Sequence, residues 1–294
     1  MIVEATAPCS IEIAGGVGAG AVRLTIALDR RASCRLETGV AGVFVHAKDQ
    51  LRRFEGESIT ALGPAAERDR VVRALVAAGV AGGVRVETQA RVPLDTGLRV
   101  GLAVSLAVTA AAEASRGKAA TAPAVALLAS QVESSLGEAP TPADVGAALV
   151  GGAHWSEEDP ASGRPLRVDP ARIEECLLLV DAGPPEGGTT GVLGADAVLQ
   201  CATALEAGQY ARVAGMLREG WAVGPLDQRV RRIREVVEGT GAAAWACRDG
   251  RLVALWAAPG TRSAGPREAV EEALRGAGLR PFPARVDVRG LEVE

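Results

Sequence analysis

The feature that most constrains the fold is an almost wholly apolar segment, GLAVSLAVTAAAEASRG, at residues 101–117. Its alanine-rich composition predicts a helix with apolar side chains on every face, which is stable only when other elements surround it. Aromatic residues form 3% of the chain although hydrophobic residues form 48%. The core must therefore be filled by small and branched side chains, and we expect helices and strands to approach one another closely around a central helix.

β-like runs and helical segments alternate on both sides of this helix. In residues 141–152, Thr141 is expected to cap a helix that has Pro142 at its first position and Asp144 in its first turn. Apolar spacing predicts further helices at residues 65–80, 122–136, 194–208, 210–223, 226–239 and 266–278. Alternating or continuous apolar runs predict strands at residues 22–37, 42–47, 83–92, 175–183, 242–250, 251–260 and 281–294.

The order of these segments indicates an α+β protein with two lobes and a cleft between them. A chain of 294 residues is long enough for one large domain or two ordinary ones. The loop GPPEGGTTG, residues 183–191, is rich in Gly, Pro and Thr and is a candidate boundary. We therefore expect an N-terminal lobe at residues 1–183 and a C-terminal lobe at residues 184–294.

Charge and composition narrow the range of partners. The net charge of −4 and the pI near 5.5 provide no broad attraction for nucleic acid or an anionic membrane, so neither is expected as a partner. No apolar run reaches the ~18 residues of a membrane span, and the N-terminus has no basic, apolar leader, which favours a cytoplasmic protein. The five cysteines are scattered and only two histidines occur, so we expect reduced, buried thiols and no zinc site.

The stretch APCSIEIAGG, residues 7–16, resembles the N-terminal signature APGRIDLAGG of the GHMP kinases, the superfamily of galactokinase, homoserine kinase, mevalonate kinase and phosphomevalonate kinase. Its Ala-Gly-Gly ending is most similar to the branch of heptose-phosphate and fucose kinases. The resemblance implies a two-lobed α+β fold, ribosomal-S5-like in the first lobe and ferredoxin-like in the second. It also implies a small-molecule ligand, a sugar or sugar phosphate, at Glu12, Gly15, Gly16, Gly151 and Gly152.

The stretch PLDTGLRVGLAV, residues 93–104, lies where the family has PpGsGLGSSAA. In the family, backbone N–H groups of this loop and the following helix N-terminus surround the nucleotide phosphates. Here Arg99, Val100 and Gly101 replace Gly-Ser-Ser, and CRDG at residues 247–250 stands where the family has a second glycine run. A bulky Arg and a β-branched Val hinder close backbone approach, which argues against the usual ATP site. The resemblance assigns nucleotide binding to Gly97, Leu98, Arg99, Gly101 and Ser105.

The stretch QVESSLGEAPTPADVGAALVGG, residues 131–152, is similar to the segment that carries the family's two functional carboxylates. The resemblance gives Glu133 a catalytic role as the ligand of Mg²⁺, and gives Asp144 the role of orienting or deprotonating the acceptor hydroxyl. Phosphoryl transfer needs such a pair because it depends on positioning and on neutralising oxygen charge. Considered without the resemblance, Asp144 is a helix cap and Glu133 a solvated helix residue.

These observations favour a kinase homologue that has lost its phosphate loops, a pseudokinase or ligand-binding module. The alternative is an active kinase that uses ATP and Mg²⁺ to phosphorylate a hydroxyl of a sugar or sugar phosphate. The short loop after Gly16, and Ser10 where relatives have arginine, weaken the case for a sugar substrate. In a third hypothesis, Arg99, Arg248 and Arg251 bind a different anion in the same cleft. A homo-oligomer is left open.

Overall fold

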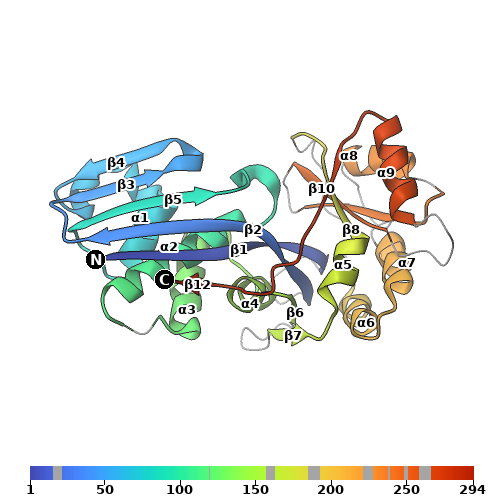
Figure 1. The fold of residues 1–294 in the computed structure, drawn as a ribbon, viewed down its shortest axis with the longest axis horizontal. Coiled ribbons are helices and arrows are strands. Elements are labelled where there is room, and N and C mark those ends of the chain that lie inside the picture. Colours follow the sequence, from blue (N-terminus) through green and yellow to red (C-terminus); the bar gives the residue numbers. More distant parts are fainter. Residues whose placement is uncertain are drawn as a thin grey trace.

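The computed structural model describes residues 1–15, 22–118, 120–156, 163–184, 193–220, 228–237, 239–247, 251–257 and 266–294. Figure 1 shows two lobes side by side, each built on its own β-sheet. The mixed α+β architecture that the order of segments predicts is therefore present. Among the described residues, no helix is long and apolar enough to cross a membrane.

The first sheet has the strand order β12-β1-β2-β5-β3-β4, with β6 and β7 attached through β2. All of its pairs are antiparallel except β3 with β5. Its strands are β1 (Ile2–Gly15), β2 (Arg23–Thr38), β3 (Val43–Ala47), β4 (Arg52–Gly56), β5 (Val84–Ala90), β6 (Ala153–Ser156), β7 (Arg164–Leu166) and β12 (Glu292–Val293).

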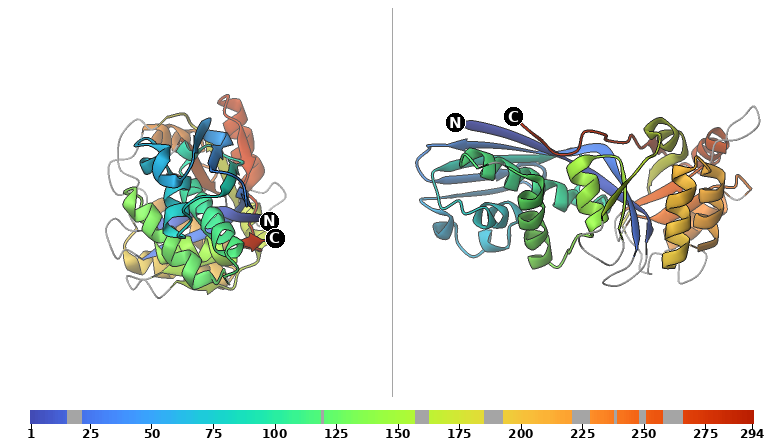
Figure 2. Two further views of the ribbon diagram at one scale, coloured as in Figure 1. Left: turned by 90° about the vertical axis from the view of Figure 1, so that its left-hand side faces the viewer. Right: turned by 90° about the horizontal axis from the view of Figure 1, so that it is seen from below.

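Helices cover one face of this sheet and leave much of the other face open (Figure 2). They are α1 (Arg70–Ala77), α2 (Val100–Ser115), α3 (Ala122–Ser135) and α4 (Pro142–Val150). Every residue of α2 from Val100 to Glu113 is buried, because the helix packs on β1 and β2 and is flanked by α1 and α3. The prediction of a buried central helix is confirmed.

The second sheet is fully antiparallel, in the order β11-β8-β10-β9. Its strands are β8 (Leu177–Asp181), β9 (Ala243–Ala246), β10 (Leu252–Trp256) and β11 (Pro281–Pro283). The helices of this part are α5 (Pro170–Cys176), α6 (Ala195–Glu206), α7 (Tyr210–Gly220), α8 (Gln228–Val236) and α9 (Pro266–Gly276).

After β11 the chain returns to the first lobe, where β12 pairs with the N-terminal half of β1 (Figure 1). Asp287 in this returning segment is buried and forms an ion pair with Arg31 of β2. The two ends of the chain are thus held together in one sheet. The boundary near residue 183 stays a prediction.

Most elements occur where the sequence predicts them, but β1, β4, β6, β7 and α5 are not among the predicted segments. The strand predicted at residues 281–294 forms only at Pro281–Pro283 and Glu292–Val293. The strand predicted from residue 175 begins at Leu177, because Glu175 and Cys176 complete helix α5, which Asp169 caps and Pro170 begins. Strands β4 and β7 carry too few apolar residues to be recognised by pattern. All five cysteines are free and buried, as expected.

Candidate active site

The loop before α2 is packed tightly against the second lobe. Gly97 has φ +83°, and a Cβ at this position would lie 1.8 Å from the backbone oxygen of Cys247. Nearby, the backbone N–H of Arg251 donates to the oxygen of Asp95 at 2.9 Å. Only glycine combines this φ with so close an approach. Backbone of the second lobe therefore lies directly on the loop where the resemblance expects nucleotide phosphates.

Arg99 occupies the N-cap of α2 in a left-handed conformation, with φ 52° and ψ 34°. This backbone geometry favours glycine, the family's residue at this position, so the loop keeps a glycine-like shape while it carries a long cationic side chain. The side chain is 7% exposed, and its Nη2 donates to Oδ2 of Asp144 at 2.5 Å. Arg99, which the resemblance places at the nucleotide phosphates, instead neutralises Asp144, which the resemblance places at the acceptor hydroxyl.

Asp144 is fully buried at the third position of α4. Its Oδ2 also accepts from the backbone N–H of Thr141 at 2.9 Å, while the Thr141 hydroxyl accepts from the Asp144 N–H at 3.3 Å, which completes a capping box. Its Oδ1 accepts from the Thr25 hydroxyl at 3.2 Å. Asp144 therefore acts as the helix cap that its position predicts, and it lies in a charged cluster as well.

The charge of Asp144 is stabilised despite its burial. Burial alone raises the pKa of Asp144, but the positive charge of Arg99 and the hydrogen bonds from Thr141 outweigh it, so the pKa lies below its ordinary value of 3.8. The carboxylate is ionised and already accepts hydrogen bonds at both oxygens.

Glu133 of α3 is also buried, at 1% exposure, so the interpretation of this residue as a solvated helix position is wrong. Arg70 donates to both of its carboxylate oxygens, from Nε at 2.8 Å and from Nη2 at 3.3 Å. The Ser105 hydroxyl donates to Oε1 at 2.5 Å. Arg70 Nη2 also reaches Glu138 at 3.1 Å. A bidentate arginine and a hydroxyl therefore occupy both oxygens of the expected magnesium ligand.

The guanidinium of Arg70 lies over the first turn of α2. A Cβ at Gly101 would lie 2.6 Å from both the Cζ and Nη2 atoms of Arg70. The absence of a side chain at residue 101, where the family has serine, makes room for Arg70 to reach Glu133. Two departures from the family's pattern, Arg99 and Gly101, therefore have structural partners, namely Asp144 and Arg70.

Glu12 near the end of β1 forms the third charged pair of this region, with Arg23 Nη1 at 2.6 Å from its Oε2. Burial raises the pKa of Glu12 above 4.5; the charge of Arg23 opposes this shift and the nearby Asp144 adds to it. A Cβ at Gly15 would lie 2.3 Å from Oε1 of Glu12. The structure thus brings Glu12 and Gly15 together beside Asp144.

The other predicted ligand residues lie in different surroundings. Gly151 and Gly152 follow the C-terminal end of α4, where Gly152 N–H donates to the oxygen of Asp287 in the returning segment. The oxygen of Leu98 accepts from Ser10 N–H at 3.0 Å, which joins the loop to β1. Gly16, Arg248 and the run at residues 187–191 lie outside the described residues.

Several polar atoms near the charged cluster are buried without a partner among the described residues. They include Nε of Arg23, Nε of Arg99 and Nδ1 of His154. His154 pairs with Thr25 across β6 and β2, and burial lowers its pKa below 6.5. Buried N–H groups are normally satisfied by protein, water or a ligand. These buried atoms leave hydrogen-bonding capacity beside Asp144 that no described residue uses.

Sequence reasoning identifies both carboxylates but not their cationic partners. Arg70 begins α1 and Arg23 begins β2, and neither lies in a recognisable motif. Only the tertiary packing of α1 and α3 on α2 brings Arg70 to Glu133. The sequence shows Arg99 as a departure from the family's pattern, yet it could not show that the partner of Arg99 is Asp144.

Comparison with known proteins depends on structure alone, since no family model and no curated protein matches the sequence. Galactokinase from Lactococcus lactis, in complex with galactose, superposes with a TM-score of 0.78 at 12% identity, over 99% of this chain and 95% of that one. A D-glycero-D-manno-heptose 1-phosphate kinase from Bacteroides thetaiotaomicron gives 0.75 at 18% identity, over 99% and 98%. Mevalonate kinase from Methanococcus jannaschii gives 0.68 at 13%, over 98% of both chains.

The protein is therefore a two-lobed α+β protein with the fold of the GHMP kinases. The resemblance carried by residues 7–16 predicted this fold, and the fold is confirmed over the whole chain. At these identities the likeness concerns the fold, and the chemistry of the site has to be argued from this chain's own residues.

Proposed function

We propose that this chain is a pseudokinase: a protein with the GHMP-kinase fold that binds a small molecule but no longer transfers phosphate. One observation carries the proposal. Each of the two carboxylates that the resemblance assigns to catalysis is paired, in a buried position, with an arginine of this chain, Glu133 with Arg70 and Asp144 with Arg99. Arg70 supplies at Glu133 the positive charge that Mg²⁺ would bring, and Arg99 occupies the carboxylate of Asp144 that an acceptor hydroxyl would face.

Magnesium does not fit the residues present. Mg²⁺ requires oxygen ligands at about 2.0–2.1 Å in near-octahedral geometry. Both oxygens of Glu133 already accept from Arg70, and a guanidinium so close repels a second cation. Among the described residues, no group of three or more His, Cys, Asp or Glu side chains could hold a metal ion. Metal binding therefore requires Arg70 to leave Glu133.

Asp144 is a poor general base in this arrangement. A base works best when its pKa lies near the working pH and its oxygen can reach the proton to be removed. The Arg99 charge and the Thr141 hydrogen bonds hold the pKa of Asp144 low, and its side chain is inaccessible. The orphaned Nε groups of Arg23 and Arg99 instead support a ligand that presents hydrogen-bond acceptors beside Asp144.

The alternative is an ATP-dependent kinase that phosphorylates a hydroxyl of a sugar or sugar phosphate. The retention of both carboxylates beside the first two turns of α2 favours it. Fold neighbours named as galactokinase and heptose 1-phosphate kinase give the class of acceptor. In this case Arg99 must release Asp144, and Arg70 must release Glu133, before the reaction can proceed.

Calorimetric titration with magnesium-ATP separates the two functions. The pseudokinase proposal predicts no saturable heat for the unaltered protein. Restoring the family's triplet alone is insufficient, because a serine at residue 101 would collide with Arg70. The matched variant therefore combines Arg99→Gly, Val100→Ser and Gly101→Ser with Arg70→Ala. Saturable binding by the unaltered protein, followed by phosphorylation of a sugar in a ³¹P NMR screen, would establish the alternative.

A further inference from the structure

A cavity of about 450 Å³ lies on the face of the first sheet that the helices leave open. Its floor is a row of cross-strand neighbours, Thr6 on β1, Ser33 on β2 and Gln89 on β5. These side chains alternate with the buried residues that face α2, so the cavity is separated from Glu133 and Asp144 by the sheet. A volume of this size suits a small molecule.

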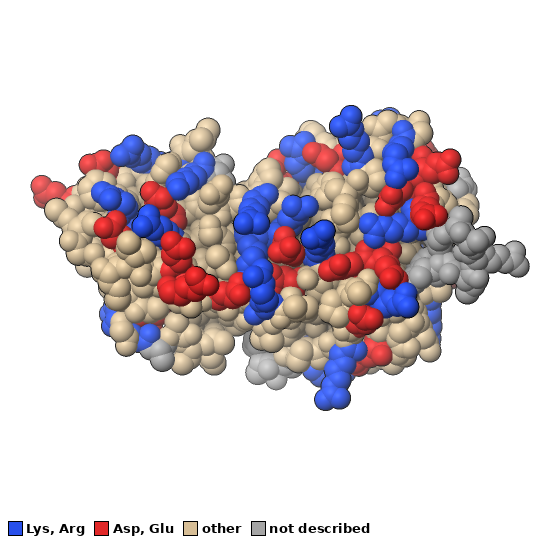
Figure 3. Space-filling model, in the orientation of Figure 1, with Lys and Arg blue, Asp and Glu red and all other residues tan. Residues whose placement is uncertain are grey.

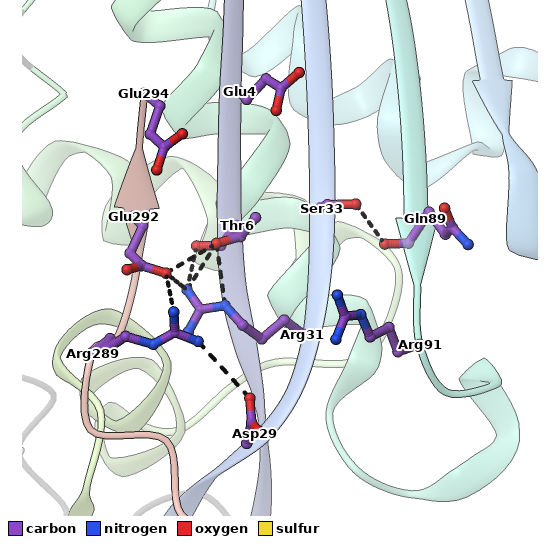
Figure 4. A pocket seen from close by; sticks show the side chains of 10 residues that line it. All are labelled: Glu4, Thr6, Asp29, Arg31, Ser33, Gln89, Arg91, Arg289, Glu292 and Glu294. Carbon is purple, nitrogen blue, oxygen red and sulfur yellow. Dashed lines mark hydrogen bonds and ion pairs between the residues drawn. The ribbon is translucent and has the colours of Figure 1, made fainter.

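Hydrogen bonds and ion pairs hold one wall of the cavity in place. Arg31 donates to the Thr6 hydroxyl at 2.9 and 3.1 Å and to the oxygen of Gly290 at 2.6 Å, and it pairs with Asp287 and Glu292. Figure 4 shows its guanidinium reaching across β1 toward β12. Its side chain is 10% exposed, and its donors are already committed. Arg31 therefore shapes the cavity rather than binding a ligand.

Arg91, directly after the end of β5, differs from Arg31 in the surroundings of its side chain. Its backbone N–H donates to the oxygen of Arg31 at 3.2 Å, which fixes its position. Its guanidinium forms no hydrogen bond or ion pair with any residue that the structure describes, and it points from the end of β5 toward β2 (Figure 4). The side-chain amide of Gln89, two residues earlier, is likewise unpaired within the described chain. Arg91 and Gln89 together offer donors to a carboxylate.

The opposite end of the cavity is acidic. Glu4 lies two residues before Thr6 on β1, and its only cationic partner among the described residues is Arg35, at 3.4 Å. Both side chains of that pair are more than half exposed, so the pair is weak. Glu294 of the adjacent segment lies beside Glu4 (Figure 4), and its side chain has no described partner.

The charges decide which class of ligand fits. Acidic and basic side chains lie side by side over this face (Figure 3), and the cavity is lined by three arginines and four carboxylates. A simple anion is attracted by Arg91 but repelled by the acidic end. A simple cation is attracted by the acidic end but repelled by Arg91. A zwitterion satisfies both ends.

Sheet geometry sets the length of this ligand. Arg91 and Glu4 are two strands apart and lie on opposite sides of the Thr6–Ser33–Gln89 row, two residues away from it in each case. With ~4.8 Å between strands and ~3.3 Å per residue, their Cα atoms are separated by about 16 Å. This separation is longer than one α-amino acid, whose amino and carboxyl groups are attached to the same carbon.

We propose that this cavity binds a zwitterion of dipeptide length, with its carboxylate on Arg91 and Gln89 and its ammonium group at Glu4. This site is distinct from the charged cluster around Glu133 and Asp144, and it does not depend on whether nucleotide binds at that cluster.

The test is an NMR titration of the full chain with L-alanyl-L-alanine, read from the backbone amides of β1, β2 and β5. N-acetyl-L-alanyl-L-alanine lacks the ammonium group and L-alanyl-L-alaninamide lacks the carboxylate. We expect saturable shifts in these strands with the free dipeptide, and affinity lower by about fivefold or more with each blocked form.

Variants locate the site. Arg91→Gln and Glu4→Gln should each weaken dipeptide binding by about fivefold, whereas Arg53→Gln, which replaces an exposed arginine of β4 outside the cavity, should leave it unchanged. All three residues are exposed, so circular dichroism should show folded proteins with similar melting temperatures. No saturable shifts, equal binding of the blocked forms, or equal weakening by Arg53→Gln would overturn the proposal.

Discussion

The guanidinium of Arg99 donates to Oδ2 of Asp144 at 2.5 Å from a backbone held at φ 52°. Left-handed backbone costs a residue with a side chain about 1–2 kcal/mol. The ion pair supplies a reason for arginine at a position whose geometry favours glycine. Because Asp144 is fully buried, loss of the arginine leaves an uncompensated charge inside the protein.

Replacement of Arg99 by glycine should therefore destabilise the protein by about 2–4 kcal/mol, measured by urea unfolding, because the uncompensated charge outweighs the relief of backbone strain. Leu51→Gly is the matched control. Leu51 has the same φ of 52° but is 91% exposed. Glycine there should change the free energy of unfolding by no more than about 1 kcal/mol. Equal effects of the two substitutions would show that the ion pair contributes nothing.

The stability of the fold should depend on pH through Asp144. The folded-state pKa of this carboxyl lies below the ordinary 3.8, so its contribution is fully present above about pH 4 and is lost as pH falls through the lower folded value. Asp144→Asn should thus lower the free energy of unfolding at neutral pH and flatten its decline in acid. A parallel pH profile for the variant and the unaltered protein would contradict this.

Glu12 should behave in the opposite sense, because its folded-state pKa is raised above 4.5. Protonation of Glu12 favours the folded state, so its ionisation removes stability as pH rises from about 4.5 through the raised value. In Glu12→Gln this loss between acid and neutral pH should disappear. Guanidinium unfolding across that pH window measures it, and an unchanged slope would show that the pKa is not raised.

Ser105 and Ser115 form a matched pair on α2. The Ser105 hydroxyl donates to buried Glu133 at 2.5 Å, whereas the Ser115 hydroxyl donates to the backbone oxygen of Ala112 at the helix end. Hydrogen bonds to charged groups contribute about 1.5–3 kcal/mol. Ser105→Ala should lower the free energy of unfolding by about that amount, and Ser115→Ala by less than about 1 kcal/mol. Equal losses would mean that Ser105 does not support the Glu133 charge.

Gly97 fixes the contact between the two lobes. Alanine at this position has to move away from Cys247, in addition to adopting φ +83°, and should destabilise the protein by about 3 kcal/mol or more. Gly137 has φ +81°, and a methyl group added there would have nothing within 4 Å, so Gly137→Ala should cost only about 1 kcal/mol. Thermal unfolding of both variants compares the strain alone with the strain plus contact, and equal losses would show that the contact with Cys247 adds nothing.

The helices other than α5 and the strands β2, β3, β5, β8, β9 and β10 could be predicted because they depend on local pattern. The two carboxylates are singled out by the resemblance to a known family. The buried helix α2 follows from its apolar composition, and the Thr141–Asp144 capping box follows from residue spacing. The ion pairs depend on tertiary packing: Arg70 and Glu133 are 63 residues apart, and Arg99 and Asp144 are 45 apart. A motif shows that a residue differs from the family's residue, but it does not show which side chain the new residue contacts.

The most direct test of the central claim is a titration of the unaltered protein with Mn²⁺ as a paramagnetic substitute for Mg²⁺, with and without ATP, read from the electron paramagnetic resonance signal of the free ion. We expect no protein-dependent loss of this signal, because Arg70 occupies the carboxylate of Glu133. A folded Arg70→Ala variant should gain Mn²⁺ binding. The result for the unaltered protein tests the claim independently of this variant. Stoichiometric Mn²⁺ binding by the unaltered protein, abolished by Glu133→Gln, would overturn the pseudokinase proposal and favour an active kinase.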